Sequence, residues 1–143
     1  MKGMKIMKIQ AFAASVLGAL VIAGSAYADG HLMVKASDQD VSGGTVTASE
    51  IGAGANGWLV VHRTDAAMKP GPVVGHAPLK SGKNVEVAAI LTEPVKKGEM
   101  LMLMLHGEAG GSKTGIFEYT LGAKEDGPVK VDGKLVMTVI TAQ

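Results

Sequence analysis

The sequence has 143 residues, with 14 basic and 13 acidic side chains, a net charge of +1 and no cysteine. This length suffices for one domain and is short for two. The balanced charge, without a basic cluster and with few aromatic residues, excludes an electrostatic nucleic-acid binder, and the lack of cysteine excludes disulfide bonds and thiolate chemistry.

Residues 1–28 have the pattern of a secretory signal peptide. Lys2, Lys5 and Lys8 precede an uncharged stretch of apolar and small residues at 11–24, and a small-x-small cleavage pattern follows at 26–28. The apolar stretch is short for a membrane span of about 20 residues. We therefore expect a cleaved leader at 1–28, a single mature domain at 29–143 with no membrane attachment, and a location in the periplasm, in the medium or at the cell surface.

The mature chain reads as a series of short β-prone segments separated by glycine and turn residues. The Asp132-Gly133 pair is a two-residue hairpin signal. This spacing predicts an all-β fold, an antiparallel two-sheet sandwich of immunoglobulin-like or cupredoxin-like type. The candidate strands occupy residues 31–36, 44–51, 58–63, 73–77, 84–91, 100–106, 116–121 and 135–141.

The segment at 100–106 reads Met-Leu-Met-Leu-Met-Leu-His, and the rest of the fold is expected to be arranged around it. As a strand it directs Met100, Met102, Met104 and His106 to one face and three leucines to the other. Apolar residues on both faces indicate a central strand that is covered on both sides.

Several short motifs together resemble an uncharacterised domain family that occurs in secreted and cell-surface proteins of bacteria and halophilic archaea. The resemblance implies a compact extracytoplasmic β-sandwich over nearly all of the mature chain, and it implies no activity. The motifs that carry it are Ser37-Asp38-Gln39, Gly57-Trp58-Leu59-Val60-Val61-His62, Gly71-Pro72-Val73-Val74-Gly75, Gly82-Lys83-Asn84-Val85, Met104-Leu105-His106, Gly115-Ile116-Phe117-Glu118-Tyr119 and Asp126-Gly127-Pro128-Val129.

The sequence offers no convincing catalytic motif. Residues 52–57 match the dinucleotide fingerprint G-x-G-x-x-G, but that motif requires a following helix and a β-prone segment follows here. There is no cysteine nucleophile and no Gly-x-Ser-x-Gly elbow. We expect a protein that is not an enzyme.

His31 is a candidate ligand for a divalent metal ion. Cleavage after Ala28 would make Asp29-Gly30-His31 the amino terminus. Its free amine, two amide nitrogens and imidazole can form a planar four-nitrogen site suited to Cu(II) or Ni(II). The alternative is that a histidine stands at this position by chance.

His62 and His106 each end an apolar strand, and Met104 shares a face with His106. If the strand ends meet, two imidazoles and a thioether can bind Cu(I) or Cu(II). A blue-copper centre is excluded because its thiolate ligand is missing. The alternative is that the methionines fill the core and that each histidine bonds a backbone carbonyl.

These observations favour an exported, non-catalytic binding module that holds copper through His31, His62, His106 and Met104, with no other cofactor. The competing interpretation is a structural cell-surface module without metal, in which exposed sheet edges serve self-association or contact with a protein partner.

Overall fold

The computed structural model describes residues 32–143. The predicted leader at 1–28 and the candidate ligand His31 lie outside the described residues. Among residues 32–143, no helix has the length and apolar character needed to cross a membrane.

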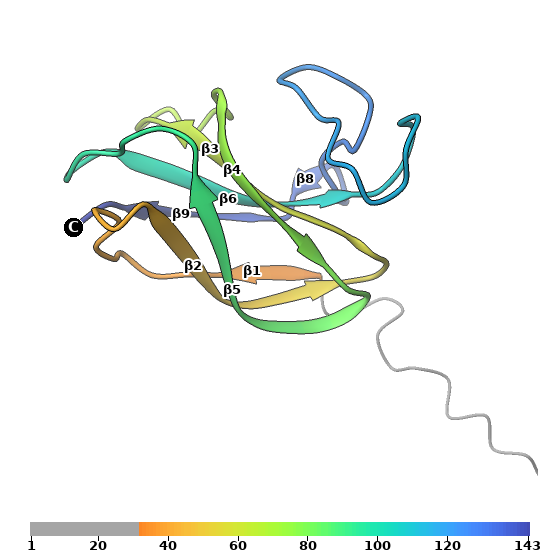
Figure 1. Ribbon diagram of the computed structural model, residues 1–143, viewed down its shortest axis with the longest axis horizontal. Coiled ribbons are helices and arrows are strands. Elements are labelled where there is room, and N and C mark those ends of the chain that lie inside the picture. Colours follow the sequence, from red (N-terminus) through yellow and green to blue (C-terminus); the bar gives the residue numbers. More distant parts are fainter. Residues whose placement is uncertain (1–31) are drawn as a thin grey trace, which may run out of the picture.

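Residues 32–143 form nine β-strands (Figure 1). Seven of them make one antiparallel sheet in the order β1-β2-β5-β4-β3-β6-β9, and the other two pair as a separate ribbon, β7-β8. The strands are β1 (Met33–Lys35), β2 (Thr45–Ala53), β3 (Gly57–Thr64), β4 (Val73–Leu79), β5 (Gly82–Leu91), β6 (Met100–Gly107), β7 (Lys130–Val131), β8 (Lys134–Leu135) and β9 (Met137–Thr141).

The seven-stranded sheet curls around a single apolar core. Strands β4 and β5 pair only at Gly75–Leu91 and His76–Ile90, and at this corner the sheet turns, so that β1, β2 and β5 lie across from β3, β6 and β9 (Figure 1). The prediction of an antiparallel all-β fold is confirmed. In place of two separate stacked sheets, the hydrogen bonds at the corner make one sheet that nearly closes into a barrel, because β1 approaches β6 and β9.

Most predicted strands are confirmed, but the prediction is wrong for residues 116–121, where no strand forms. This segment lies between Gly115 and Gly122, whose positive φ angles of 82° and 83° turn the chain at either end. The β-prone segment is instead an unpaired loop that buries Tyr119 and exposes Ile116 and Leu121.

The Asp132-Gly133 hairpin is confirmed. It joins β7 to β8, and both residues have the positive φ angles, 51° and 77°, that a tight two-residue turn requires. The glycine-rich segment after β2 is also a turn, and strand β3 follows it directly, so no helix N-terminus is available there to hold a pyrophosphate.

Strand β6 is buried on both faces from Leu101 to His106, as the sequence predicts. Its leucines belong to the central core inside the curled sheet. Met102, Met104 and His106 are fully buried as well, on the opposite face. The sheet therefore has a second, smaller buried layer on its outer side, and this layer contains the buried histidines.

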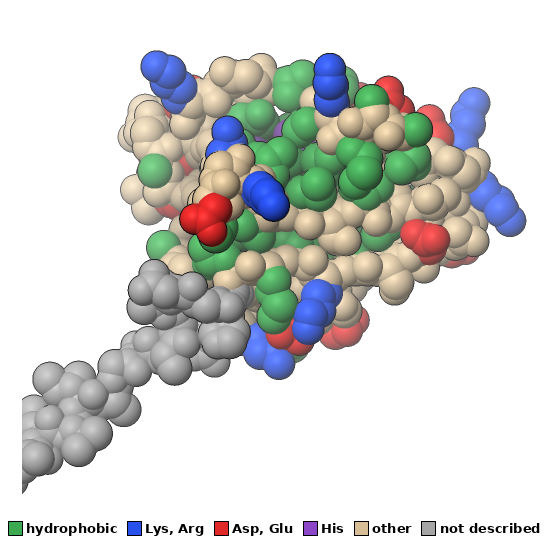
Figure 2. Space-filling model, turned by 180° about the vertical axis from the view of Figure 1, so that it is seen from behind, with side chains coloured by type: hydrophobic (Ala, Val, Ile, Leu, Met, Phe, Trp, Pro, Cys, Tyr) green, Lys and Arg blue, Asp and Glu red, His purple; other side chains and the backbone are tan. Residues whose placement is uncertain are grey.

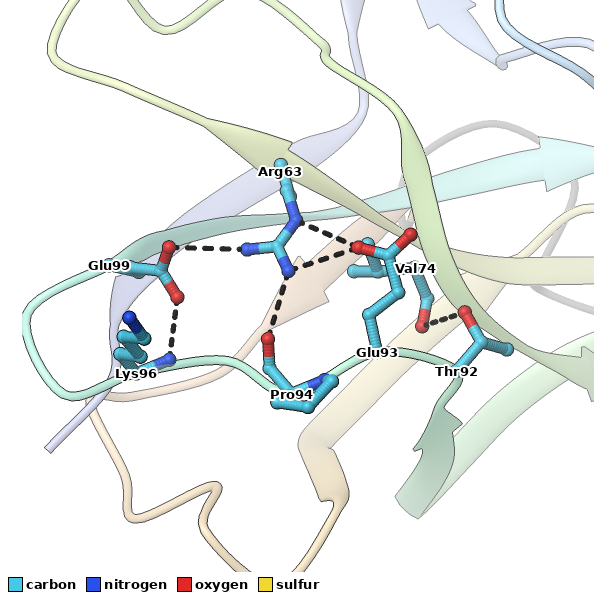
Figure 3. A network of polar contacts seen from close by, with 7 residues as sticks. All are labelled: Arg63, Val74, Thr92, Glu93, Pro94, Lys96 and Glu99. Carbon is cyan, nitrogen blue, oxygen red and sulfur yellow. Dashed lines mark hydrogen bonds and ion pairs between the residues drawn. The ribbon is translucent and has the colours of Figure 1, made fainter.

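Arg63, near the end of β3, holds the connection between β5 and β6 in place (Figure 3). Its guanidinium donates to the Glu93 carboxylate at 3.1 and 3.3 Å, to Glu99 at 3.4 Å and to the Pro94 carbonyl at 2.9 Å. Glu99 in turn accepts the backbone N–H of Lys96. These bonds fix the loop that leads into β6 and so help to fix the start of the central strand.

Substitution of Gly57 should test how tightly β3 and β6 are packed. A Cβ at position 57 would lie 2.3 Å from the His106 carbonyl oxygen, so the strands must separate. We expect Gly57→Ala to lower the free energy of unfolding by about 2–3 kcal/mol in urea denaturation. The matched control is Gly43→Ala, because a Cβ at that exposed turn would have no neighbour within 4 Å. Equal stability of the two variants would contradict the described packing.

Candidate metal centre

The two predicted ligand histidines lie on the outer face of neighbouring strands. His62 of β3 stands opposite Met102 of β6, and His106 lies four positions further along β6. Because side chains alternate along a strand, His62, Met102, Met104 and His106 share one face. Met104 therefore occupies the register between the two histidines.

The imidazoles of His62 and His106 meet edge to edge in the outer buried layer. Their Nε2 atoms lie 3.3 Å apart. The Nδ1 atom of His62 lies 2.8 Å from the Gly71 carbonyl oxygen, and Nδ1 of His106 lies 2.7 Å from the Asp126 carbonyl oxygen. Both side chains are 0% exposed. Each ring therefore has one nitrogen held by the backbone and the other directed at its partner.

Local irregularities of the backbone orient both rings. The register of β3 against β4 shifts between Val61 and His62, and such a bulge re-aims the side chain that follows it. Gly71 approaches the strand so closely that a Cβ there would lie 2.6 Å from the Arg63 carbonyl oxygen. Asp126 has a φ of 46°, a left-handed conformation that aspartate tolerates. The two acceptor carbonyls thus come from constrained turns.

The hydrogen-bond arrangement of the pair requires more protons than two neutral rings carry. A carbonyl oxygen only accepts, so each Nδ1 must carry a proton, and a neutral imidazole has one N–H. Both Nε2 atoms then present lone pairs to each other. A third proton or a cation between the Nε2 atoms would relieve this repulsion. The geometry thus supplies two converging nitrogen donors in a site closed to solvent.

Burial disfavours the third proton. Desolvation lowers the pKa of His106 from 6.5 to about 4, against the opposing effect of the Asp126 carbonyl. Desolvation also lowers the pKa of His62, against the Gly71 carbonyl. Both rings are therefore neutral at pH 7, which is the protonation state in which imidazole binds metal ions.

The loop at 108–129 covers the pair, and Tyr119 is the residue in contact. Its ring packs edge-on at 4.5 Å between centroids from His106 and at 5.9 Å from His62. The buried Asp126 carboxylate holds the loop by accepting the backbone N–H groups of Ala109 and Glu118. The same residue thus orients His106 through its carbonyl and anchors the covering loop through its side chain.

His76 lies apart from the pair. It is exposed on β4, and its ring stacks on Phe117 at 4.2 Å and meets the Trp58 ring edge-on at 5.7 Å. Trp58 donates its Nε1–H to Glu108 at 3.1 Å. His76 is the exposed member of this aromatic group, and Trp58 is buried.

The structure brings together three of the four predicted ligands: His62 and His106 in contact, and Met104 between them in register. Within residues 32–143, no group of three or more His, Cys, Asp or Glu side chains is placed to hold a metal ion. A metal ion at the pair therefore needs a donor of another type. Sequence reasoning missed Tyr119, which lies in a segment predicted to be a strand. It also missed the Gly71 and Asp126 carbonyls, because any residue type can supply a backbone carbonyl.

Residues 32–143 match the family model described as "Domain of unknown function (DUF7282)". No curated protein and no solved structure matches the chain.

The lowered pKa values predict a loss of stability in acid. The unfolded state takes up protons near pH 6.5, whereas folded His106 remains neutral down to about pH 4. Because the unfolded state binds more protons in this window, the free energy of unfolding should fall as the pH drops, by on the order of 2–3 kcal/mol for His106. Urea denaturation of the metal-free protein at several pH values measures this.

The control for this measurement is His106→Gln, which keeps a donor for the Asp126 carbonyl but does not titrate. Its stability should change less between pH 6.5 and 5, a range above the titration of Glu99 and Glu118, whose pKa values are lowered by their hydrogen bonds to the Lys96 backbone and the Ser112 hydroxyl. Wild-type stability that rises in acid would show instead that the pair shares a proton.

Proposed function

The chain belongs to the domain family DUF7282, and we propose that it is an exported, non-catalytic module that binds a copper ion through His62, His106 and Met104. The observation that carries this proposal is the 3.3 Å separation of two Nε2 atoms whose rings are both anchored through Nδ1. In metal sites, a ligand histidine is usually fixed by such a bond from its other nitrogen.

The separation of the two nitrogens suits ligands of one ion. Two donors at 2.0–2.1 Å from a metal, at a tetrahedral angle, lie about 3.3–3.4 Å apart. A linear arrangement would need about 4 Å. The two rings therefore have the spacing of adjacent tetrahedral ligands and would need little movement on binding.

The third donor in this proposal is the thioether of Met104. It lies in register between the histidines and is fully buried with them. Thioether sulfur is a soft ligand that prefers copper among the first-row metals. Met102, opposite His62 on the same face, is a further buried methionine of this strand.

Export completes the proposal. The leader pattern at 1–28 directs the chain to the periplasm, the medium or the cell surface. Cleavage after Ala28 would also create the amino-terminal Asp29-Gly30-His31 site for Cu(II). That site would use a separate set of nitrogen atoms, and His31→Ala removes its imidazole without changing His62, His106 or Met104.

A specific observation favours a second candidate, a structural module that associates through its surface. Ile90 is 74% exposed and Val85 60% exposed, and Ile116 and Leu121 are more than half exposed. Figure 2 shows apolar side chains gathered on one face of the molecule. The open sheet edges expected from the sequence give weaker support for self-association. The edge strands β1 and β9 lie close to each other, so each partly covers the other edge. Light scattering of the metal-free protein decides this candidate: dimers or larger assemblies support it.

Replacement of the histidines tests the metal site. In a His31→Ala background, we expect His62→Gln and His106→Gln each to weaken copper binding at least about 100-fold, because each variant leaves only one imidazole to bind the ion. The measurement is a chelator competition with Cu(I) under reducing conditions. The control is His76→Gln, an exposed histidine outside the pair, which should bind like the parent. Unchanged titrations for the two buried variants would refute the proposed site.

Replacement of Met104 tests the third donor. Met104→Leu keeps the volume and apolar character of the side chain and removes the sulfur. We expect copper affinity to fall about 10- to 100-fold while urea denaturation changes by less than about 1.5 kcal/mol. The control is Met100→Leu, on the same face and strand but at its half-buried end. Equal affinities for the two variants would exclude Met104 as a ligand.

A further inference from the structure

We infer that the site at His62 and His106 selects a monovalent soft ion, Cu(I) or Ag(I), over divalent ions, and that Tyr119 is a positioning residue for this selection. The inference rests on the proposed function and adds the charge state of the ion.

No atom that would coordinate the ion carries a negative charge. Both imidazoles are tied to carbonyl groups and present only lone pairs. The buried carboxylate closest in sequence to these contacts, Asp126, uses one oxygen for the Ala109 N–H, at 3.1 Å, and the other for the Glu118 N–H, at 2.8 Å. A thioether is neutral as well. The Asp126 carboxylate acts on His106 from outside this set of ligand atoms, and its single charge can balance a monocation but leaves a dication with an uncompensated charge in a buried environment.

The desolvation cost of that charge depends on its square. By the Born relation, a dication costs about four times as much to bury as a monocation of the same radius. With no carboxylate or thiolate among the donors, nothing in the first coordination layer offsets the difference. Neutral nitrogen and sulfur donors, by contrast, are the ligands that Cu(I) prefers.

Tyr119 strengthens the preference by excluding water. Divalent ions with few protein ligands commonly complete their coordination with water. Here His62 and His106 are 0% exposed, and the Tyr119 ring packs against both. The position that a water ligand would need is thus lined by an aromatic side chain.

The experiment compares Ag(I), a monovalent ion stable in air, with Zn(II). In the His31→Ala protein at pH 7, we expect chelator competition to give a dissociation constant for Ag(I) at least about 1000-fold lower than for Zn(II). A ratio below about tenfold would overturn the monovalent preference while leaving metal binding intact. If neither ion binds, the proposed function fails and this inference fails with it.

Variants of Tyr119 test its role through the ratio of the two constants. Tyr119→Phe keeps the ring and should keep the ratio. Tyr119→Leu opens space beside the histidines, and we expect the ratio to fall at least about tenfold as Zn(II) gains water ligands. A residue that only stabilises the fold would change both affinities by the same factor, and that result would overturn the assignment of Tyr119. The parent ratio tests the charge preference even if Tyr119→Leu does not fold.

Discussion

The central constraint in this structure is a shortage of protons between two buried rings. Each imidazole gives its single N–H to a backbone carbonyl, which leaves the Nε2 atoms of His62 and His106 in contact with no hydrogen between them. A protein core rarely leaves polar atoms in such a relation without a functional reason. The irregular features around the pair, the bulge in β3, the close approach of Gly71 and the left-handed turn at Asp126, hold the two rings in place.

This constraint links the strands to the loop that covers them. Asp126 bonds His106 with its carbonyl and the loop backbone with its carboxylate, and the loop places Tyr119 on both rings. The strands alone would leave the outer face of β6 open to solvent. The loop at 108–129 completes that layer, in which burial lowers the pKa of His106. Fold and candidate site therefore depend on the same small set of contacts.

The sequence predicts the all-β class, most strands and the two buried faces of β6, because these follow from the two-residue period of side chains along a strand. It also predicts that Met104 and His106 share a face of their strand, whereas the position of His62 on that same face follows only from the register of β3 against β6. It does not predict that the rings touch, since this depends on a bulge and on carbonyl groups that any residue could supply. The error at 116–121 has a related cause: the residues are β-prone, but a strand also needs a partner, and pairing is a non-local property.

Two neighbouring contacts join the beginning and the end of the described chain. The Thr141 N–H donates to Asp38, 103 positions away, and Gln39 pairs with Ala142 beside it. A chain that emerges amino end first, from a ribosome or through a membrane pore, cannot complete this sheet until its last strand has appeared. Until then β6 lacks one of its two hydrogen-bonded neighbours, β9, and long-range pairing of this kind is slow. Maturation of the domain is therefore a late event, finished only after synthesis of the whole segment, and a passage through a narrow channel would meet an extended chain rather than a closed barrel.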